Sequence, residues 1–325
     1  MPPSGLDFAQ ETSAPDERAV TAEFVQFLTA ALTKRHPSGP IPRFNQGRAS
    51  GCVEADFIVP DGLAPALRVG LFARPRAYRA WIRFANASSG SDREKDVRGM
   101  SIALRDVEGE NLTAGSARQD FVLNSHPVMM VPGTREFLDL MRAANAGGAR
   151  RAWYFLSHPA AARVAFASRR HHTSHLEIPY WSTTPYLFGK GRAVKYLVRP
   201  AKAGASALPN PLTDTYLRDT LRARLRQSET SFDFLIQFRI DTGSMPLEDA
   251  SVEWKERDSP FMHVARIVIP RQDIDAAGRD AQCEQMAFNP WHCLAEHRPL
   301  GNMNRARREI YQAMAKLRAE RGLRV

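Results

Sequence analysis

The chain has 325 residues, of which 43% are hydrophobic and 25% are charged, and its formal net charge is +10 at pH 7. This composition is normal for a globular protein, and no stretch approaches the ~18 consecutive apolar residues of a transmembrane helix, so we expect no membrane partner. The positive charge would permit binding to nucleic acid. The arginines are scattered, however, and no nucleic-acid-binding motif accompanies them, so we expect no specific nucleic-acid partner.

The N-terminal segment and the cysteines bear on organisation and location. Residues 1–19 mix acidic residues with proline and serine and lack the basic and then apolar pattern of a signal peptide. We therefore predict a disordered leader there, followed by one domain over residues 20–325. The three cysteines, Cys52, Cys283 and Cys293, form an odd and sparse set, which argues against a disulfide framework and predicts a reducing, cytoplasmic location.

Hydrophobic periodicity and breaker residues divide the chain into helices and strands. In chain order, we expect a helix at 19–36, strands at 52–59, 80–88, 99–109 and 119–131, helices across 135–170 broken near 147 and 159, a strand at 192–200, a helix at 214–227, strands at 231–240 and 262–272, and a closing helix at 302–325. The strands follow one another too closely for βαβ units and predict an antiparallel sheet or barrel. The fold class is therefore α+β.

Sites built on histidine or on common catalytic motifs find little support. The run HHTSH at 171–175 offers metal ligands, but no carboxylate-rich motif follows it, so a polar surface turn is favoured. His292 and His297 flank Cys293 in sequence, which says little about the geometry of a Cys–His nucleophile and favours a structural role. The chain contains no G-x-S-x-G, Walker A or G-x-G-x-x-G motif.

The closing helix carries an unusual face. Arg307, Tyr311 and Arg318 are spaced by four and seven residues, so all three lie on one side of the helix. A charged face of this kind usually meets solvent. The alternative is that the tyrosine and its arginines bind a ligand, and the rest of the chain decides between the two.

Several blocks elsewhere resemble the catalase superfamily, and most closely its small bacterial catalase-related haem proteins. The blocks are PRFNQGRASG, WIRFANAS, DVRGMSIAL, QDFVLNSHPVMM, YWSTTPYLFGKGRAVKYLVRP, MPLEDASVEW and FNPWHCLAEHRPLGNMNRARREIY. They occur in the family's order from about residue 40 to 318. The resemblance implies a catalase-like closed antiparallel β-barrel of about eight strands with surrounding helices, and haem b held between the barrel and the closing helix.

The resemblance also implies roles on the proximal side of the haem. Tyr311 matches the tyrosine that binds haem iron, and Arg307 matches the arginine one turn before it. A free tyrosine has a pKa near ~10, and a guanidinium on the same face, together with the metal, favours the phenolate. Arg43, Arg83 and Arg318 match arginines that bind the haem propionates.

On the distal side the chain departs from the family pattern. The family's R-x-x-H motif reads R-F-N-Q from Arg43 to Gln46, so glutamine stands in the place of the catalytic histidine. The serine that orients this histidine is matched by Ala85, whereas the distal asparagine is kept as Asn124. Glutamine donates and accepts hydrogen bonds but does not carry a proton between peroxide oxygens, so ordinary catalase activity should be weak or absent.

Other positions near the haem are also implied by the resemblance. Phe137 matches a phenylalanine that stacks on the haem, and Met129 and Met130 replace a pair of phenylalanines. Two histidines are candidate substitute bases: His126, which would share a face with the distal asparagine on an alternating strand, and His36, which lies ten residues before the glutamine.

Three functions remain open on these residues. The first is a haem peroxidase or catalase-related oxidoreductase that acts on a peroxide or hydroperoxide, with Gln46, Asn124 and His126 as the catalytic candidates. The second is a haem-dependent biosynthetic enzyme acting on another small molecule, and the third is a haem sensor or carrier without turnover. The expected partners are a small-molecule substrate and, as a possibility left open, further copies of the chain in a homo-oligomer.

Overall fold

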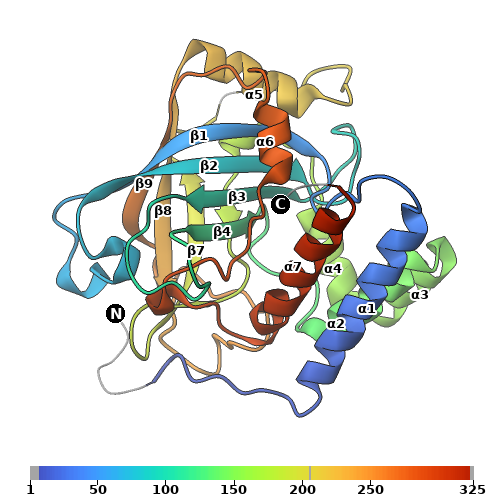
Figure 1. Ribbon diagram of the computed structural model, residues 1–325. Helices are drawn as coiled ribbons and strands as arrows, with labels where there is room; N and C mark the ends of the chain where they lie inside the picture. The colour runs from blue at the N-terminus through green and yellow to red at the C-terminus, as the bar shows by residue number, and fades with distance from the viewer. Residues whose placement is uncertain (1–6, 205, 323–325) are drawn as a thin grey trace.

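Nine strands form one antiparallel sheet that closes into a barrel within residues 7–204 and 206–322, the part of the chain that the computed structural model describes. They are β1 (Ala49–Val59), β2 (Arg76–Asn86), β3 (Arg98–Leu104), β4 (Gln119–Asn124), β5 (Tyr180–Trp181), β6 (Tyr186–Leu187), β7 (Ala193–Pro200), β8 (Thr230–Phe238) and β9 (Met262–Ile269). The order across the sheet is β5-β4-β3-β2-β1-β9-β8-β7-β6, and β5 also pairs with β7. Figure 1 shows β1, β2, β3 and β4 lying side by side in this order. Because β5 and β6 both pair with β7, the barrel has eight strand positions, which confirms the predicted fold.

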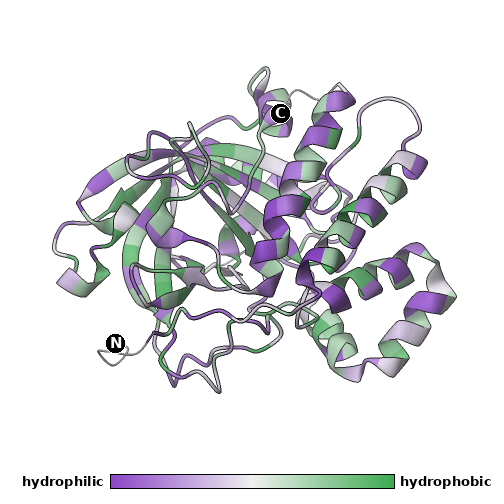
Figure 2. Ribbon diagram, turned by 60° about the horizontal axis from the view of Figure 1, so that its bottom comes forward, coloured by the Kyte–Doolittle hydropathy of each residue, from purple (hydrophilic) through white to green (hydrophobic). Residues whose placement is uncertain are grey.

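Helices surround the barrel on two sides. They are α1 (Glu17–Arg35), α2 (Thr134–Asn145), α3 (Gly148–Ser157), α4 (Pro159–Ser168), α5 (Tyr216–Gln227), α6 (Arg279–Gln285) and α7 (Asn302–Glu320), with 3-10 turns at Pro65–Leu67, Gly70–Phe72, His175–Glu177 and Ala295–His297. The α1, α2 and α7 helices pack against one another on one flank of the barrel, and α5 and α6 contact β1 on another (Figure 1). The helices of the flank alternate between hydrophobic and hydrophilic residues along their lengths (Figure 2).

The interior of the barrel is filled with aromatic side chains and is a packed core, not a channel. Phe121 and Phe234 lie with ring centroids 4.8 Å apart, and Phe57 stacks on Phe121 at 6.0 Å. All three are almost completely buried. Such inward-facing aromatics bury large apolar areas and favour offset or edge contacts, so they stabilise the barrel and leave ligand binding to its outside.

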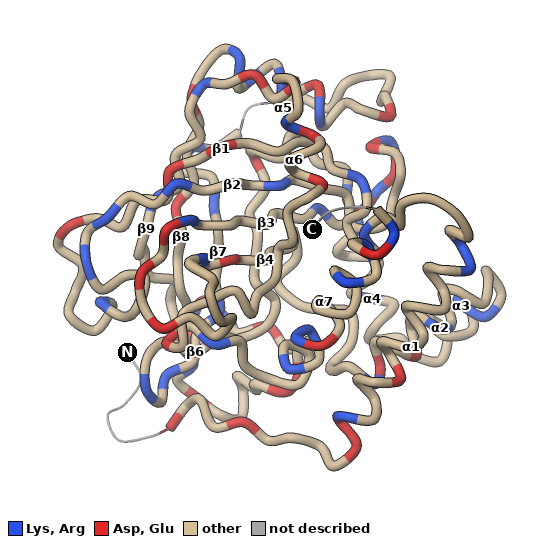
Figure 3. Tube along the Cα trace, viewed as in Figure 1, with Lys and Arg blue, Asp and Glu red and all other residues tan. Residues whose placement is uncertain are grey.

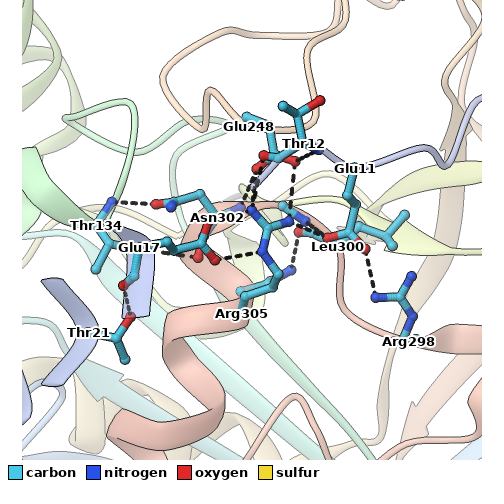
Figure 4. Close-up of polar contacts among 12 residues, drawn as sticks. Glu11, Thr12, Glu17, Thr21, Thr134, Glu248, Arg298, Leu300, Asn302 and Arg305 are labelled. Atoms are coloured by element: carbon cyan, nitrogen blue, oxygen red, sulfur yellow. Dashed lines mark hydrogen bonds and ion pairs between the residues drawn. The ribbon is translucent and has the colours of Figure 1, made fainter. Parts of the chain in front are cut away.

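The chain before α1 is packed against the body of the protein, in contrast to the disordered leader predicted over residues 1–19. Phe8 is 3% exposed, and Glu11 forms salt bridges with Arg298 and Arg305. Figure 4 shows Arg305 between Glu17 and Glu248, to which it also donates hydrogen bonds. These carboxylates raise the pKa of Arg305 although burial opposes the shift. The acidic residues before and at the start of α1 therefore form ion pairs with Arg305 near the start of α7, and do not form a solvated tail. Residues 1–6 lie outside the described residues.

A disulfide joins Cys52 on β1 to Cys283 on α6, although the odd and sparse set of cysteines argued against a disulfide framework. The two residues are 231 positions apart in sequence, but their Cα atoms are 6.0 Å apart. Counting cysteines cannot reveal this proximity, because it depends on how α6 packs against the barrel. Cys293 is free and buried. The disulfide removes the sequence argument for a reducing compartment.

Charge is distributed without a dominant basic tract. Figure 3 shows lysine and arginine interspersed with aspartate and glutamate along most of the trace. Many of the arginines are paired with carboxylates, as Arg218 is with Asp275 and Asp280. In the described part of the chain, none of the helices is both long and apolar enough to cross a membrane.

Candidate active site

A cavity lies between the barrel and the helices α1 and α7. Its empty volume is about 880 Å³ when the solvent at its open mouth is included. The lining residues come from α1, the segment before β1, three barrel strands, the segment before α7 and α7 itself: Leu28, Leu32, Pro42, Arg43, Phe44, Asn45, Gln46, Arg83, Ser101, Val122, Ala287, Phe288, Ile310, Tyr311, Met314, Ala315 and Arg318. The cavity therefore brings together five residues that the sequence singled out for one site.

Tyr311 reaches the cavity from α7. Within the described part of the chain, no group forms a hydrogen bond with its hydroxyl, so the oxygen is available to a ligand. Arg307, one turn earlier, does not line the cavity. Its Nη1 donates to Thr184 Oγ1 and to Asn304 Oδ1, both at 3.1 Å. Arg307 is therefore held by neutral partners and keeps its positive charge uncompensated near the start of the turn that carries Tyr311.

Three arginines from distant parts of the chain form a cluster at the same cavity. Arg43, Arg83 and Arg318 all contact the carboxylate of Glu284 on α6. Burial lowers the pKa of Arg83 to about 10, and the nearby charge of Arg43 adds to the effect. Burial and Arg43 likewise lower the pKa of Arg318 to about 10. Three guanidinium groups thus face one carboxylate, and the cluster retains an excess of positive charge that favours further carboxylates.

The residues at this cavity fit a haem group. Haem b carries two propionates, which match the two positive charges that Glu284 leaves uncompensated. Arg83 is 1% exposed and its Nε has no hydrogen-bond partner among the described residues, which is costly for a buried donor unless a ligand completes it. Leu28, Ile310 and Met314 supply apolar walls, and the Tyr311 hydroxyl offers an oxygen ligand for ferric iron.

Gln46 is held in a strained backbone conformation at the cavity wall. Its φ is +56°, a region that residues other than glycine seldom occupy. Arg83 Nη2 donates to the main-chain carbonyl of Gln46 at 2.7 Å, and the main-chain N–H of Gln46 donates to the Ala87 carbonyl at 2.9 Å. Its side-chain Nε2 donates to Asn124 Oδ1 at 3.3 Å. These contacts fix both the main chain and the side-chain amide of Gln46 at the cavity wall. Asn124 does not line the cavity itself but contacts this side-chain amide.

Gly99 on β3 makes room for this side chain. A Cβ atom at Gly99 would lie 2.3 Å from the side-chain carbon and nitrogen of Gln46, far closer than atoms approach in real structures. A larger residue at position 99 would therefore force the end of the Gln46 side chain to move from this place. Gly99 lies in the block DVRGMSIAL, but the sequence alone did not reveal its role. That role depends on a contact with a residue 53 positions away in sequence.

Several predicted site residues lie away from the cavity. His126 does not line it, because β4 ends at Asn124 and the chain bends before the alternation can continue. Burial and the nearby Arg170 lower the pKa of His126. Phe137 on α2 packs edge-on against Phe24 of α1 at 5.6 Å and is also absent from the cavity wall.

His36, Met129 and Met130, which the sequence also suggested near the haem, lie outside the cavity lining as well. His36 caps the end of α1, where its carbonyl accepts a hydrogen bond from Arg321. Met129 and Met130 pack in an apolar cluster with Tyr154 outside the cavity lining. Among the described residues that line the cavity there is no histidine, aspartate or glutamate.

The two histidine-rich segments are buried or half-buried. His175 is fully buried, stacks on Phe84 at 5.2 Å and contacts the Tyr180 hydroxyl at 3.0 Å, so the predicted surface turn is wrong. The small polar residues of that segment suggested exposure, but the segment packs against the barrel. Burial raises the pKa of Cys293 to about 12, and His292 pairs with Asp120, not with the thiol. The structural reading of that cysteine is confirmed.

Glu284 is the main residue that sequence reasoning missed. It lies on α6, a helix of seven residues that the periodicity did not reveal, and it is the acidic partner of all three clustered arginines. Its only sequence signal is its position next to Cys283, whose disulfide was not expected either.

Comparison with known proteins places this geometry in context. No family model matches the chain. Catalase A from Saccharomyces cerevisiae superposes with a TM-score of 0.70 over 98% of this chain and 68% of its own length, at 16% identity. A fungal catalase superposes with a TM-score of 0.69 over 90% of this chain and 62% of that protein, at 17% identity. The fold is that of the catalases.

The sequence is also similar to that of a known peroxidase. The catalase-related peroxidase of Mycolicibacterium paratuberculosis is 28% identical over 261 residues, which cover 74% of this chain and 77% of the relative. This chain spans only 62% of the length of the fungal catalase. Together the matches show a catalase-like fold and a sequence similarity to a catalase-related peroxidase.

Proposed function

We propose that this protein is a haem-binding, catalase-related oxidoreductase that acts on a peroxide or hydroperoxide and has little true catalase activity. The observation that carries the proposal is the single cavity that unites an unpartnered tyrosine hydroxyl with a three-arginine cluster of excess positive charge. The catalase fold and the similarity to a catalase-related peroxidase support it. In this reading Tyr311 is the axial ligand, and Arg43, Arg83 and Arg318 bind the propionates.

Bound haem would supply a redox-active iron that exchanges electrons with a peroxide. The chain itself would orient that substrate through the amide of Gln46, whose place is fixed by Asn124 and by the backbone contacts of its own residue. An amide does not take a proton from one peroxide oxygen and return it to the other. Loss of a general acid–base group lowers rates by ~10²–10⁴-fold, so dismutation of hydrogen peroxide should be slow.

Two other functions are weighed against this one. A haem carrier or sensor without turnover is favoured by the lack of histidine, aspartate and glutamate among the described residues that line the cavity. A biosynthetic step on another small molecule has no specific support in the cavity.

The experiment that separates the functions is a paired assay of the haem-loaded protein. Hydrogen peroxide alone measures dismutation, and an organic hydroperoxide with a reducing cosubstrate measures peroxidase turnover. Peroxidase turnover that exceeds dismutation supports the proposal. Absence of both activities in a protein that retains haem favours the carrier, and vigorous dismutation contradicts the assigned role of Gln46.

A further inference from the structure

The Glu284 carboxylate lies among the guanidinium groups that a ligand carboxylate would need. Its carboxylate contacts Arg43 Nη1, Arg83 Nη2 at 3.4 Å and Arg318 Nη2 at 3.5 Å. Each of the three clustered arginines therefore directs at least one terminal nitrogen at this single side chain. Two carboxylates that share the same donors compete, because they repel each other and because each guanidinium nitrogen has few hydrogens.

The backbone around Glu284 is fastened on both sides. The Cys52–Cys283 disulfide ties the preceding residue to β1, and Cys52 lies directly opposite Arg83 in the β1–β2 ladder. Arg43 Nη2 donates to the carbonyls of Cys283 at 3.1 Å and Met286 at 2.7 Å. The backbone of α6 is thus held against the cluster independently of the Glu284 side chain.

The Glu284 side chain is more exposed to solvent than two of the arginines that it contacts. Its exposed fraction is 35%, whereas that of Arg83 is 1% and that of Arg318 is 6%. Movement toward water would therefore need less rearrangement for this carboxylate than for the two arginines.

On the basis of the proposed haem function, we propose that Glu284 is a built-in competitor for the haem propionates. It stabilises the arginine cluster of the haem-free protein and lowers the affinity of the site for a ligand that carries carboxylates. The disulfide and the Arg43 contacts keep this carboxylate at the cluster. Glu284 thereby sets how readily the protein takes up and releases haem.

The variant Glu284→Gln tests the proposal through two measurements that should change in opposite directions. The melting temperature of the haem-free protein should fall, because three buried guanidinium groups lose their shared anion. The affinity for haem, measured by absorbance titration, should rise by about 3- to 30-fold, the range for losing a few partly exposed ion pairs. Glu54→Gln is a matched control, because Glu54 also pairs with an arginine, Arg79, but lies away from the cavity.

A neutral porphyrin distinguishes competition from general damage. The dimethyl ester of haem lacks the propionate charges, so its affinity should be the same in wild type and Glu284→Gln. Haem affinity that is unchanged or lower in the variant overturns the proposal and makes Glu284 a structural residue only. If the variant does not fold, Glu284→Asp, whose carboxylate is drawn back by one methylene, should show a smaller rise; no rise there overturns the proposal as well. Failure of the wild type to bind either porphyrin instead refutes the proposed function.

Discussion

Replacing Gln46 with histidine tests whether the missing proton carrier limits hydrogen peroxide turnover. The backbone of residue 46 should keep its place, because the contacts with Arg83 at 2.7 Å and with Ala87 at 2.9 Å involve only main-chain atoms of that residue. Asn124, now 3.3 Å from the glutamine amide, remains as a neighbour of the new imidazole. Ala85 offers no hydroxyl to orient the ring.

The expected gain follows from these contacts. A well-placed acid–base group contributes ~10²–10⁴-fold, and an imidazole without its orienting hydroxyl should give less, about 10- to 10³-fold. The gain should appear as the pH rises through ~6.5, because the neutral imidazole is the form that accepts a proton. The double variant Gln46→His with Ala85→Ser should exceed the single variant, because a positioned base outperforms a loose one.

The assay is oxygen release from hydrogen peroxide by haem-loaded protein, normalised to haem content. Gln46→Asn is the matched control: it keeps an amide, cannot carry a proton and should give no gain. Vigorous oxygen release by the wild type would refute the reasoning, and so would a double variant that is no faster than the wild type.

Two further predictions concern binding and stability. Arg83→Ala should weaken haem retention by about 1.5–3 kcal/mol, the range for hydrogen bonds to charged groups. Arg76→Ala should change haem retention little, because Arg76 pairs with the exposed Glu108 outside the cavity. Equal losses for the two variants in an absorbance titration would mean that general charge is responsible. Replacing both Cys52 and Cys283 with alanine should lower the free energy of unfolding by about 2–5 kcal/mol, because the disulfide closes a very long loop. A denaturant midpoint equal to that of the wild type would show that this disulfide does not form.

The sequence predicted those parts of the fold that depend on local pattern. The helices across 135–170 break where glycine and proline interrupt them, and α3 and α4 begin at Gly148 and Pro159. The β1 strand extends three residues before its predicted start, and the strand predicted over 119–131 ends at Asn124. The short strands β5 and β6, which complete the barrel against β7, carry too few residues to show any periodicity.

The candidate site was predictable only where a motif resembled a known family. The resemblance assigned Arg43, Arg83 and Arg318 to one binding site although they are far apart in sequence. The structure brings all three to one cavity. The resemblance could not reveal Glu284 or the disulfide beside it, because both depend on the packing of a short helix against the barrel. It also suggested His126, whose strand ends too early for the predicted alternation.

The most direct test of the account is an absorbance titration of the purified protein with ferric haem, performed in parallel on Tyr311→Phe. We expect saturable binding of one haem per chain and a high-spin ferric spectrum with tyrosinate ligation in the wild type. The variant should lose haem or show a different spectrum. Haem content and a spectrum in Tyr311→Phe that equal those of the wild type, or no saturable binding by the wild type, would contradict the assignment of this cavity.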